Sequence, residues 1–426
     1  MEEQNEVRTG GQKRYVSDRG GRNGSGRSGF LPGVFVGILV AIIAVGILFA
    51  LRGGGASSTG GSGHAANGQA VDDATVNKLK VLEQYIDYYY YKADEVKDDQ
   101  IRDGVYKGLL DSLGDVYSGY YTPEEYQSIM EQMEGVYYGI GAYVSQDVET
   151  GQSVISGVIK NTPAEAAGLM DGDIIYKVDG VEMAGLTLEE VVSHIKGEEG
   201  TKVTITLIRS GSEIEVEITR AMVSAPTVDS EMLEDGIGYL QITEFDDVTV
   251  GQFKENMASL REQGMKGLIV DLRGNPGGSV TSVCAIAEQF LPEGLVFYME
   301  DKNGERTEYP CKGADWDLPL VVLVNEYSAS ASEIFSGAVK DAGIGKLVGK
   351  KTYGKGVVQN LIPLEDGSAI KITVANYYTR NGNDINLKGI DPDVEADLDS
   401  EAYLEDKTDT QLNKAIEVLK EEMAAQ

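Results

Sequence analysis

The sequence predicts an α/β domain with a largely parallel sheet, preceded by a single transmembrane helix, a helical region and a small β-rich domain. The α/β domain is predicted because apolar strand segments alternate with helical segments from about residue 227 onward. The β-rich domain is predicted because short alternating strands are separated by glycine-containing turns within residues 139–220. The transmembrane helix is predicted from residues 30–51, an apolar run without charges.

Composition narrows the classes of partner. The chain has 426 residues, of which 42% are hydrophobic and 25% charged, as is usual for globular proteins with two or three domains. A formal net charge of −32 argues against a nucleic-acid partner, because phosphates would be repelled over most of the surface. Two cysteines, Cys284 and Cys311, are too few for a disulfide framework, and the sequence leaves open whether they pair.

The apolar run at 30–51 also predicts a location. Six basic residues precede it, and only Arg52 follows before a long uncharged stretch. This asymmetry predicts a cytoplasmic N-terminus and a single-pass cell-membrane protein whose remaining chain lies outside the cytoplasm. A cleaved signal peptide is the alternative, but its apolar core is normally only about 7–15 residues long.

A linker and a helical region are predicted between the apolar run and the β-rich domain. Residues 52–70 are rich in glycine and serine and predict a flexible linker. Helical periodicity follows over about residues 71–134, where Thr122 and Glu125 have the spacing of a capping box. The four tyrosines at 88–91 are expected to pack in a core or an interface.

The β-rich segment resembles a PDZ domain. The resemblance rests on "GIGA" at 139–142 and on "GLMDGDIIYKVDG" at 168–180, together with one long helix at 186–195. Glycines let consecutive backbone N–H groups converge on a peptide carboxylate, and the adjoining strand edge accepts an added strand. The expected peptide-binding residues, which would select apolar tails, are Gly139, Ile140, Gly141, Ala142, Val144, Val191, Val192 and Ile195.

Chemistry is expected in three loops of the α/β domain: "DLRGNPGG" at 271–278, "SASASE" at 328–333 and "KTYGKGVVQ" at 351–359. A serine at a strand-to-helix turn would expose its hydroxyl beside the helix dipole, which favours a developing oxyanion. The chain has two histidines, His64 and His194, and neither lies in this domain. A desolvated lysine can replace histidine as the base, and Lys355 between two glycines is the candidate. Spacing alone leaves a Ser/Lys pair open.

Together, the PDZ-like segment and the three loops resemble the carboxy-terminal processing proteases, also called tail-specific proteases. The resemblance covers the chain from about residue 71 to the last helix, and the separation of the serine from the lysine matches the family. It implies a crotonase/ClpP-like α/β protease core with Ser330 as nucleophile, Lys355 as general base and Gln359 as the group that orients the lysine. It further implies oxyanion donors at Ala331, Gly277 and Gly278, no metal and no cofactor.

The resemblance also implies partners. Substrates would be polypeptides with apolar C-termini, and the N- and C-terminal helices would form a homodimer or a higher oligomer. The predicted domain order is 1–29 cytoplasmic tail, 30–51 anchor, 52–70 linker, 71–134 helical region, 135–224 PDZ domain, 225–398 protease core and 399–426 C-terminal helical tail.

The leading hypothesis is therefore a membrane-anchored serine endopeptidase. One alternative is a PDZ adaptor with an inactive protease-like domain, although Ser330 and Lys355 are both present. Another is a crotonase-like acyl-transfer enzyme, against which the inserted PDZ-like segment and the predicted location count.

Overall fold

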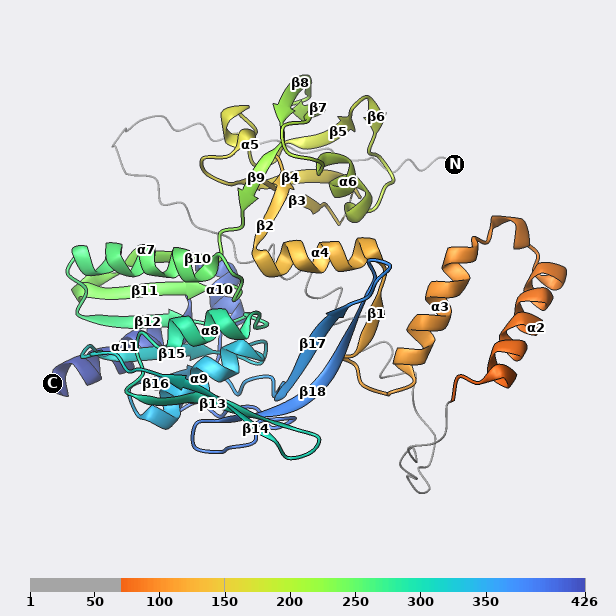
Figure 1. Ribbon diagram of the computed structural model, residues 1–426. Coiled ribbons are helices and arrows are strands. Elements are labelled where there is room, and N and C mark those ends of the chain that lie inside the picture. The colour runs from red at the N-terminus through yellow and green to blue at the C-terminus, as the bar shows by residue number, and fades with distance from the viewer. Residues whose placement is uncertain (1–69, 149, 426) are drawn as a thin grey trace, which may run out of the picture. The chain divides into compact units, whose positions relative to one another are not determined.

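A computed structural model describes residues 70–148 and 150–425, which Figure 1 shows as a coloured ribbon. Along this part of the chain, a helical segment, a β-rich segment and an α/β segment follow one another. Their order agrees with the predicted order, whereas the exact domain boundaries stay predictions.

The transmembrane helix is the element of the predicted fold class that has to be corrected. In residues 70–148 and 150–425, none of the helices has the length and the apolar character needed to cross a membrane. The run at 30–51, from which the span was predicted, lies outside the described residues. The fold is thus an α/β core with a PDZ-like segment and helices, and the location outside the cytoplasm stays a prediction.

The helical segment ends in a well-capped helix that leads into the β-rich segment. Its elements are α2 (Asp73–Tyr89), η1 (Ala93–Glu95), α3 (Asp98–Asp111), β1 (Gly119–Tyr121) and α4 (Pro123–Glu134). The predicted capping box is confirmed, because the Thr122 N–H donates to the Glu125 carboxylate at 2.8 Å and the Glu125 N–H donates to the Thr122 hydroxyl at 3.3 Å. At the other end of α4, Gly135 has a left-handed φ of 69°, which suits glycine.

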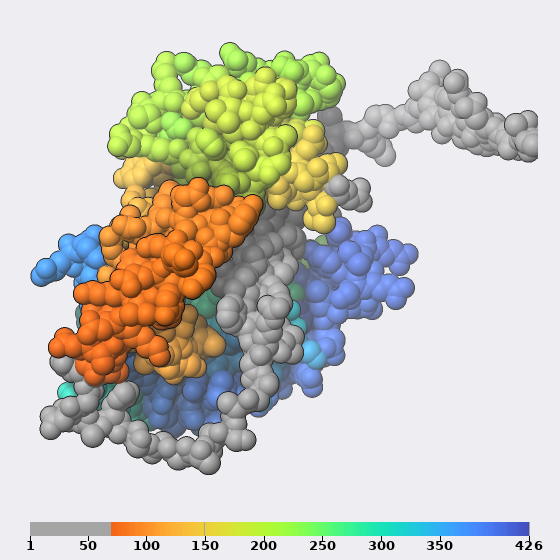
Figure 2. Space-filling view, turned by 90° about the vertical axis from the view of Figure 1, so that its right-hand side faces the viewer, coloured from red at the N-terminus to blue at the C-terminus, as the bar shows by residue number. Residues whose placement is uncertain are grey.

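The tyrosines at 88–91 are not in a core. All four are exposed, and no residue of α2 is buried. Figure 2 shows the outer surface of this helical segment in orange. The expectation of core packing for these side chains is therefore wrong within the described chain, and a role in an interface stays a prediction.

The β-rich segment forms a small sheet with its own core. Its elements are β2 (Val136–Gly139), β3 (Ala142–Gln146), β4 (Ser153–Val158), α5 (Pro163–Ala166), β5 (Ile174–Val178), β6 (Val181–Glu182), α6 (Leu188–Ile195), β7 (Lys202–Arg209), β8 (Ser212–Thr219) and β9 (Ala221–Ser224). The sheet runs β3-β4-β5-β7-β8, with β6 on β5, while β2 and β9 pair separately. The expected long helix is α6, and the short helix α5 was not expected.

The α/β segment holds a six-stranded sheet in the order β10-β11-β12-β15-β16-β19, with all pairs parallel except β10–β11. Its strands are β10 (Val228–Met232), β11 (Ile237–Ile242), β12 (Gly267–Asp271), β15 (Leu320–Val324), β16 (Lys346–Gly349) and β19 (Val394–Glu395). Its helices are η2 (Glu234–Gly236), α7 (Thr249–Glu262), α8 (Val280–Ala287), α9 (Ala331–Ala342), α10 (Ser400–Asp406) and α11 (Thr410–Ala425). The prediction of a largely parallel sheet is confirmed.

A second sheet is antiparallel and joins distant parts of the chain. It contains β13 (Gly294–Asp301), β14 (Arg306–Cys311), β17 (Val357–Pro363) and β18 (Ala369–Thr379), and β1 pairs with β18. This pairing brings the segment after α3 to β18, the partner of β17, and β17 is the strand that follows the lysine loop.

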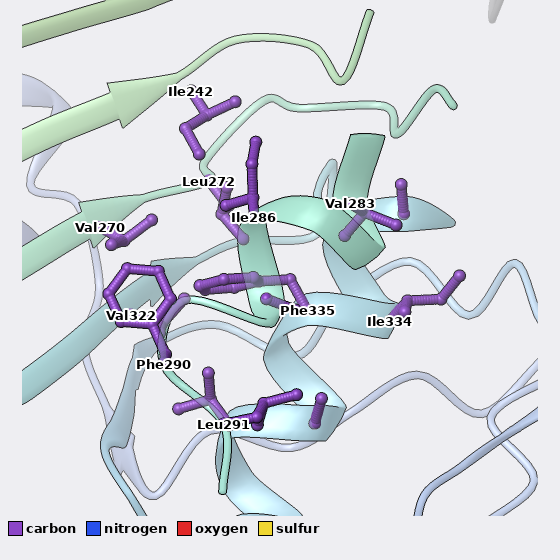
Figure 3. Packing of buried hydrophobic residues seen from close by; sticks show 14 of the residues in the cluster. Ile242, Val270, Leu272, Val283, Ile286, Phe290, Leu291, Val322, Ile334 and Phe335 are labelled. Carbon is purple, nitrogen blue, oxygen red and sulfur yellow. The ribbon is translucent and has the colours of Figure 1, made fainter. Parts of the chain in front are cut away.

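The parallel sheet is buried on both faces, which explains its continuous apolar strands. Val270 and Val322 belong to the cluster on the face that α7, α8 and α9 cover. Figure 3 shows side chains of this cluster, where Phe290 and Phe335 meet edge to face with ring centroids 5.6 Å apart. On the other face, Val321 belongs to a cluster with α11 side chains. The apolar stripe of α11 thus packs against this sheet, and the oligomer implied by the family resemblance stays a prediction.

The two cysteines do not pair. Cys284 is half-buried, Cys311 is buried, and both are free thiols.

Candidate active site

Ser330 lies at the turn between β15 and α9, in a strained conformation. It is the N-cap residue of α9, with φ 55° and ψ −113°. A non-glycine residue with such angles costs about 1–3 kcal/mol, and strain of this kind recurs at nucleophile turns. The backbone is fixed on both sides, since its N–H donates to Glu333 at 2.9 Å and its carbonyl accepts from the Tyr377 hydroxyl at 3.0 Å. The half-buried side chain of Ser330 therefore sits at a helix N-terminus, where negative charge is favoured.

The glycine turn after β12 lies directly against Ser330. A Cβ on Gly277 would be 2.7 Å from the Cβ of Ser330 and 2.9 Å from the backbone nitrogen of Ala331, so only glycine fits. The Gly277 N–H donates to Asn275 Oδ1 at 2.8 Å. Among the described residues, the N–H groups of Gly278 and Ala331 donate to no protein group. The Gly277 N–H is therefore already engaged, whereas those of Gly278 and Ala331 are not, and the oxyanion role of these groups stays a prediction.

Lys355 lies in a loop that another loop approaches very closely. A Cβ on Gly354 would lie 2.9 Å from the backbone nitrogen of Gly389, and one on Gly356 would lie 2.6 Å from that of Asn386. The glycines on both sides of Lys355 are thus required by packing.

The surroundings of Lys355 favour its neutral form. Burial lowers the pKa of Lys355 to about 8, the charge of Lys371 lowers it as well, and Glu333 and Asp115 act in the opposite direction. The ammonium nitrogen lies 4.9 Å from the ring centroid of Tyr117, which comes from the segment before β1. A lysine with this pKa can accept a proton near neutral pH.

The predicted catalytic side chains are not hydrogen-bonded to one another among the described residues. No hydrogen bond joins Ser330 Oγ to Lys355 Nζ in the described chain. Gln359 lies in β17, and its Nε2 donates to Thr373 Oγ1 at 3.1 Å rather than to the lysine. Its Oε1 accepts no hydrogen bond from the described residues.

Sequence reasoning missed two buried residues, Asn275 and Glu333. Asn275 donates from Nδ2 to the Ile242 carbonyl at 2.9 Å, and its own carbonyl accepts from the Ala329 N–H at 3.0 Å. It therefore ties the glycine turn both to the sheet and to the serine loop. Asparagine in "RGNPGG" was visible as part of a turn, but nothing in the sequence indicates which atoms it would reach.

The loop after β12 is braced by an ion pair between Asp271 and Arg273. The Arg273 guanidinium lies 2.6 Å from Asp271 Oδ2 and 2.8 Å from Asp409 Oδ2. Asp409 precedes α11, so the pair joins the glycine-rich loop to the C-terminal helix.

The predicted peptide-binding loop of the β-rich segment turns at Gly141, and its role in binding stays a prediction. Gly141 has φ 85°, and a Cβ there would lie 2.3 Å from Thr162. Among the described residues, the N–H groups of Ile140 and Gly141 donate to no protein group. Gly139 ends β2 just before this loop.

The residues predicted to line the apolar pocket differ in burial. Ile140, Val191 and Ile195 are buried in the core of the β-rich segment, and Ala142 and Val144 are only partly buried against it. Val192 on α6 is half-buried outside that core. The three buried residues therefore belong to the core of the segment. The positions that a bound peptide could still reach lie on β3 and at Val192 on α6.

Comparisons with known proteins agree with this architecture. Residues 236–396 match peptidase family S41, and residues 154–209 match a PDZ domain. The chain is 38% identical over 374 residues to carboxy-terminal processing protease CtpA of Bacillus subtilis (strain 168), covering 87% of this chain and 78% of the relative. It is 35% identical over 331 residues to a probable CtpA-like serine protease of Staphylococcus aureus (strain N315), covering 76% and 66%.

One solved structure is also similar. It is a photosystem II D1 C-terminal processing protease, with 30% sequence identity, a TM-score of 0.45, and coverage of 80% of this chain and 90% of that one. The long match to the Bacillus relative, together with the two domain matches, identifies the family. The chain belongs to the carboxy-terminal processing proteases of peptidase family S41, serine proteases that carry a PDZ domain and act on polypeptides.

Proposed function

We propose that the chain is a Ser/Lys endopeptidase in which Ser330 is the nucleophile and Lys355 is the general base. The observation that carries the proposal is the burial of Lys355 between two tightly packed glycines, with its pKa lowered to about 8. Only a lysine that loses its proton near neutral pH can act as a base there. Neither of the chain's two histidines lies in the α/β segment, so no histidine competes for this role.

The reaction then follows in two stages. Ser330 Oγ attacks the scissile carbonyl carbon while neutral Lys355 takes the hydroxyl proton. The carbon–nitrogen bond breaks, and the same proton passes to the leaving amine. A water molecule, deprotonated by Lys355, next attacks the ester carbon. The bond from that carbon to Ser330 Oγ breaks, Lys355 passes the proton to Ser330 Oγ, and the new carboxyl end is released.

The negative oxygen of each tetrahedral intermediate would be held by the N–H groups of Gly278 and Ala331. Removal of one such donor typically costs about 10²–10³ in rate. Gln359 Oε1 would accept from the Lys355 amine and orient it toward Ser330. Since catalytic hydrogen bonds often shorten only in the substrate complex, we expect the Ser330–Lys355 contact to form when a peptide binds.

Recognition of apolar tails is the second part of the proposal. The N–H groups of Ile140 and Gly141 would receive the terminal carboxylate. Strand β3 lies at the edge of its sheet and contacts α6, so a substrate tail can add beside it as a further strand. Val144 and Val192 would then contact the apolar side chains of the tail.

The experiment compares cleavage of fluorescein-labelled casein by the full chain and by Ser330→Ala and Lys355→Ala. Each has a matched control. Ser336→Ala removes a buried hydroxyl without a hydrogen-bond partner on the same helix, and Lys351→Ala removes an exposed lysine from the same loop. We expect both active-site variants to lose activity by about 10³-fold or more, and both controls to retain it.

Two results would overturn the proposal. Equal cleavage by the parent and Ser330→Ala would show that another group is the nucleophile. If the parent binds an apolar-tailed peptide but never cleaves casein or that peptide, the alternative of a PDZ adaptor with an inactive protease-like domain replaces the endopeptidase.

A further inference from the structure

Glu333 is a buried carboxylate at the centre of the site, with no role in the mechanism so far. It lies in the first turn of α9, three residues after Ser330, and its side chain is fully buried, with 0% exposed. A buried carboxylate is stable only when hydrogen-bond donors surround it. Its partners therefore define what it does.

The two oxygens of Glu333 accept four hydrogen bonds from two loops. Oε2 accepts from the backbone N–H of Ser330 at 2.9 Å and from that of Lys355 at 2.9 Å. Oε1 accepts from the Thr352 hydroxyl at 2.6 Å and from the Gly354 N–H at 2.7 Å. One carboxylate oxygen thus touches the backbone of both residues that the proposed mechanism requires.

The four donors also indicate the charge of Glu333. Three of them are backbone N–H groups, which can only donate, so a carboxylate without a proton suits the site best. Burial raises the pKa of Glu333, and the hydrogen bonds act against that rise. The fourth donor is the Thr352 hydroxyl. Its oxygen accepts from the Ile390 N–H at 2.7 Å, which leaves its proton for Glu333 Oε1.

The negative charge acts on the lysine as well as on the backbone. Besides Glu333, the charged or titratable groups that face Lys355 are Lys371 on β18, and Asp115 and Tyr117 before β1. Glu333 and Asp115 favour the protonated lysine, and Lys371 disfavours it.

We propose that Glu333 is a positioning residue, which holds the backbone of Ser330 and that of Lys355 on one carboxylate oxygen. The inference rests on the proposed Ser330/Lys355 mechanism. A displacement of about 1 Å between reacting groups costs about 10²-fold in rate, so loss of this link should act mainly on kcat.

The test uses the full chain, a fluorogenic peptide with an apolar C-terminus, and kcat and KM measured from pH 6 to 10. In Glu333→Gln the amide NH₂ cannot accept, so at least one pair of donors loses its acceptor. We expect kcat to fall about 10²-fold or more with KM within about threefold of the parent. We also expect the acid limb of kcat/KM to move to lower pH, because removal of a negative charge favours the neutral lysine.

Two further variants separate positioning from folding. Glu333→Asp keeps the charge but shortens the side chain, so kcat should fall while the acid limb stays within about 0.3 pH units of the parent. Glu326→Gln changes an exposed glutamate in the loop before α9 and should behave as the parent. Thermal unfolding midpoints of all variants are measured alongside.

The outcomes distinguish this inference from the mechanism on which it rests. Parent-like kcat and an unmoved acid limb in Glu333→Gln would overturn the inference, as would a lower melting midpoint with unchanged kinetics. If Glu333→Gln does not fold, Glu333→Asp is the test, and a parent-like kcat in that variant would overturn the inference. Activity retained in Ser330→Ala would instead overturn the mechanism itself, whatever Glu333 does.

Discussion

The pH dependence of cleavage follows directly from the surroundings of Lys355. The pKa of a lysine is ordinarily 10.5, and here burial lowers it to about 8. At pH 7 about one lysine in ten is then neutral, compared with about one in 3,000 at the ordinary value. Burial therefore makes the base about 300-fold more available at neutral pH, which corresponds to about 3 kcal/mol.

Cleavage should become faster as the pH rises toward the pKa of Lys355. Protonated Lys355 cannot accept the serine proton, so kcat/KM of the full chain should rise about tenfold per pH unit below pH 8 and level off above it. The assay is hydrolysis of a fluorogenic peptide at substrate concentrations below KM, from pH 6 to 10. In Lys371→Gln a nearby positive charge is lost, so the limb should move to higher pH and activity at pH 7 should fall about two- to threefold.

Three results would refute this reasoning. They are a limb near pH 10.5, which would mean that burial does not affect the working lysine, a flat profile, or a limb in Lys371→Gln that moves to lower pH. The unfolding midpoint across the same pH range serves as the control for loss of structure.

Three other substitutions test the described contacts. Gly277→Ala adds a Cβ 2.7 Å from Ser330 Cβ at a φ of 111°, so kcat should fall about 10²-fold or more. In the control Gly251→Ala the added Cβ meets no atom within 4 Å, and kcat should be unchanged. Burial raises the pKa of Asp246 to about 8, so the folded chain keeps a proton that the unfolded chain loses from about pH 4 upward, and stability falls as pH rises through that window. In urea unfolding, Asp246→Asn should therefore gain about 2–4 kcal/mol more over the parent at pH 8.5 than at pH 5, and an equal gain at both would contradict the account. Gly141→Ala places a Cβ 2.3 Å from a side-chain atom, and fluorescence anisotropy should show at least about tenfold weaker binding of an apolar-tailed peptide, against unchanged binding if the loop is not the site.

The sequence allowed the α/β segment, the β-rich segment and the loops of Ser330 and Lys355 to be predicted. Continuous apolar strands between helices have few other interpretations, and the three loop motifs are specific in combination. The transmembrane helix was inferred from a run of apolar residues at 30–51 alone, and no described helix has the length and apolarity to support it.

What could not be predicted depends on contacts between residues far apart in the chain. The spacing of Glu333 from Ser330 is typical of a helix capping box, and only the fold brings the Lys355 loop to the same carboxylate. The position of Ala415 on α11 is similar: an amphipathic helix predicts a buried face but not whether that face covers a sheet or another chain. Val191 and Ile195 likewise belong to an apolar face that packs into the core rather than lining a groove.

The most direct test of the central claim is covalent labelling of the nucleophile. The full chain and its Ser330→Ala and Ser336→Ala variants are reacted with a fluorophosphonate at pH 8, and the adduct is located by intact-mass and peptide mass spectrometry. We predict one adduct per chain on the peptide that contains Ser330, present in Ser336→Ala and absent in Ser330→Ala. An adduct on another residue, or one that persists in Ser330→Ala, would contradict the assignment of Ser330 as the nucleophile.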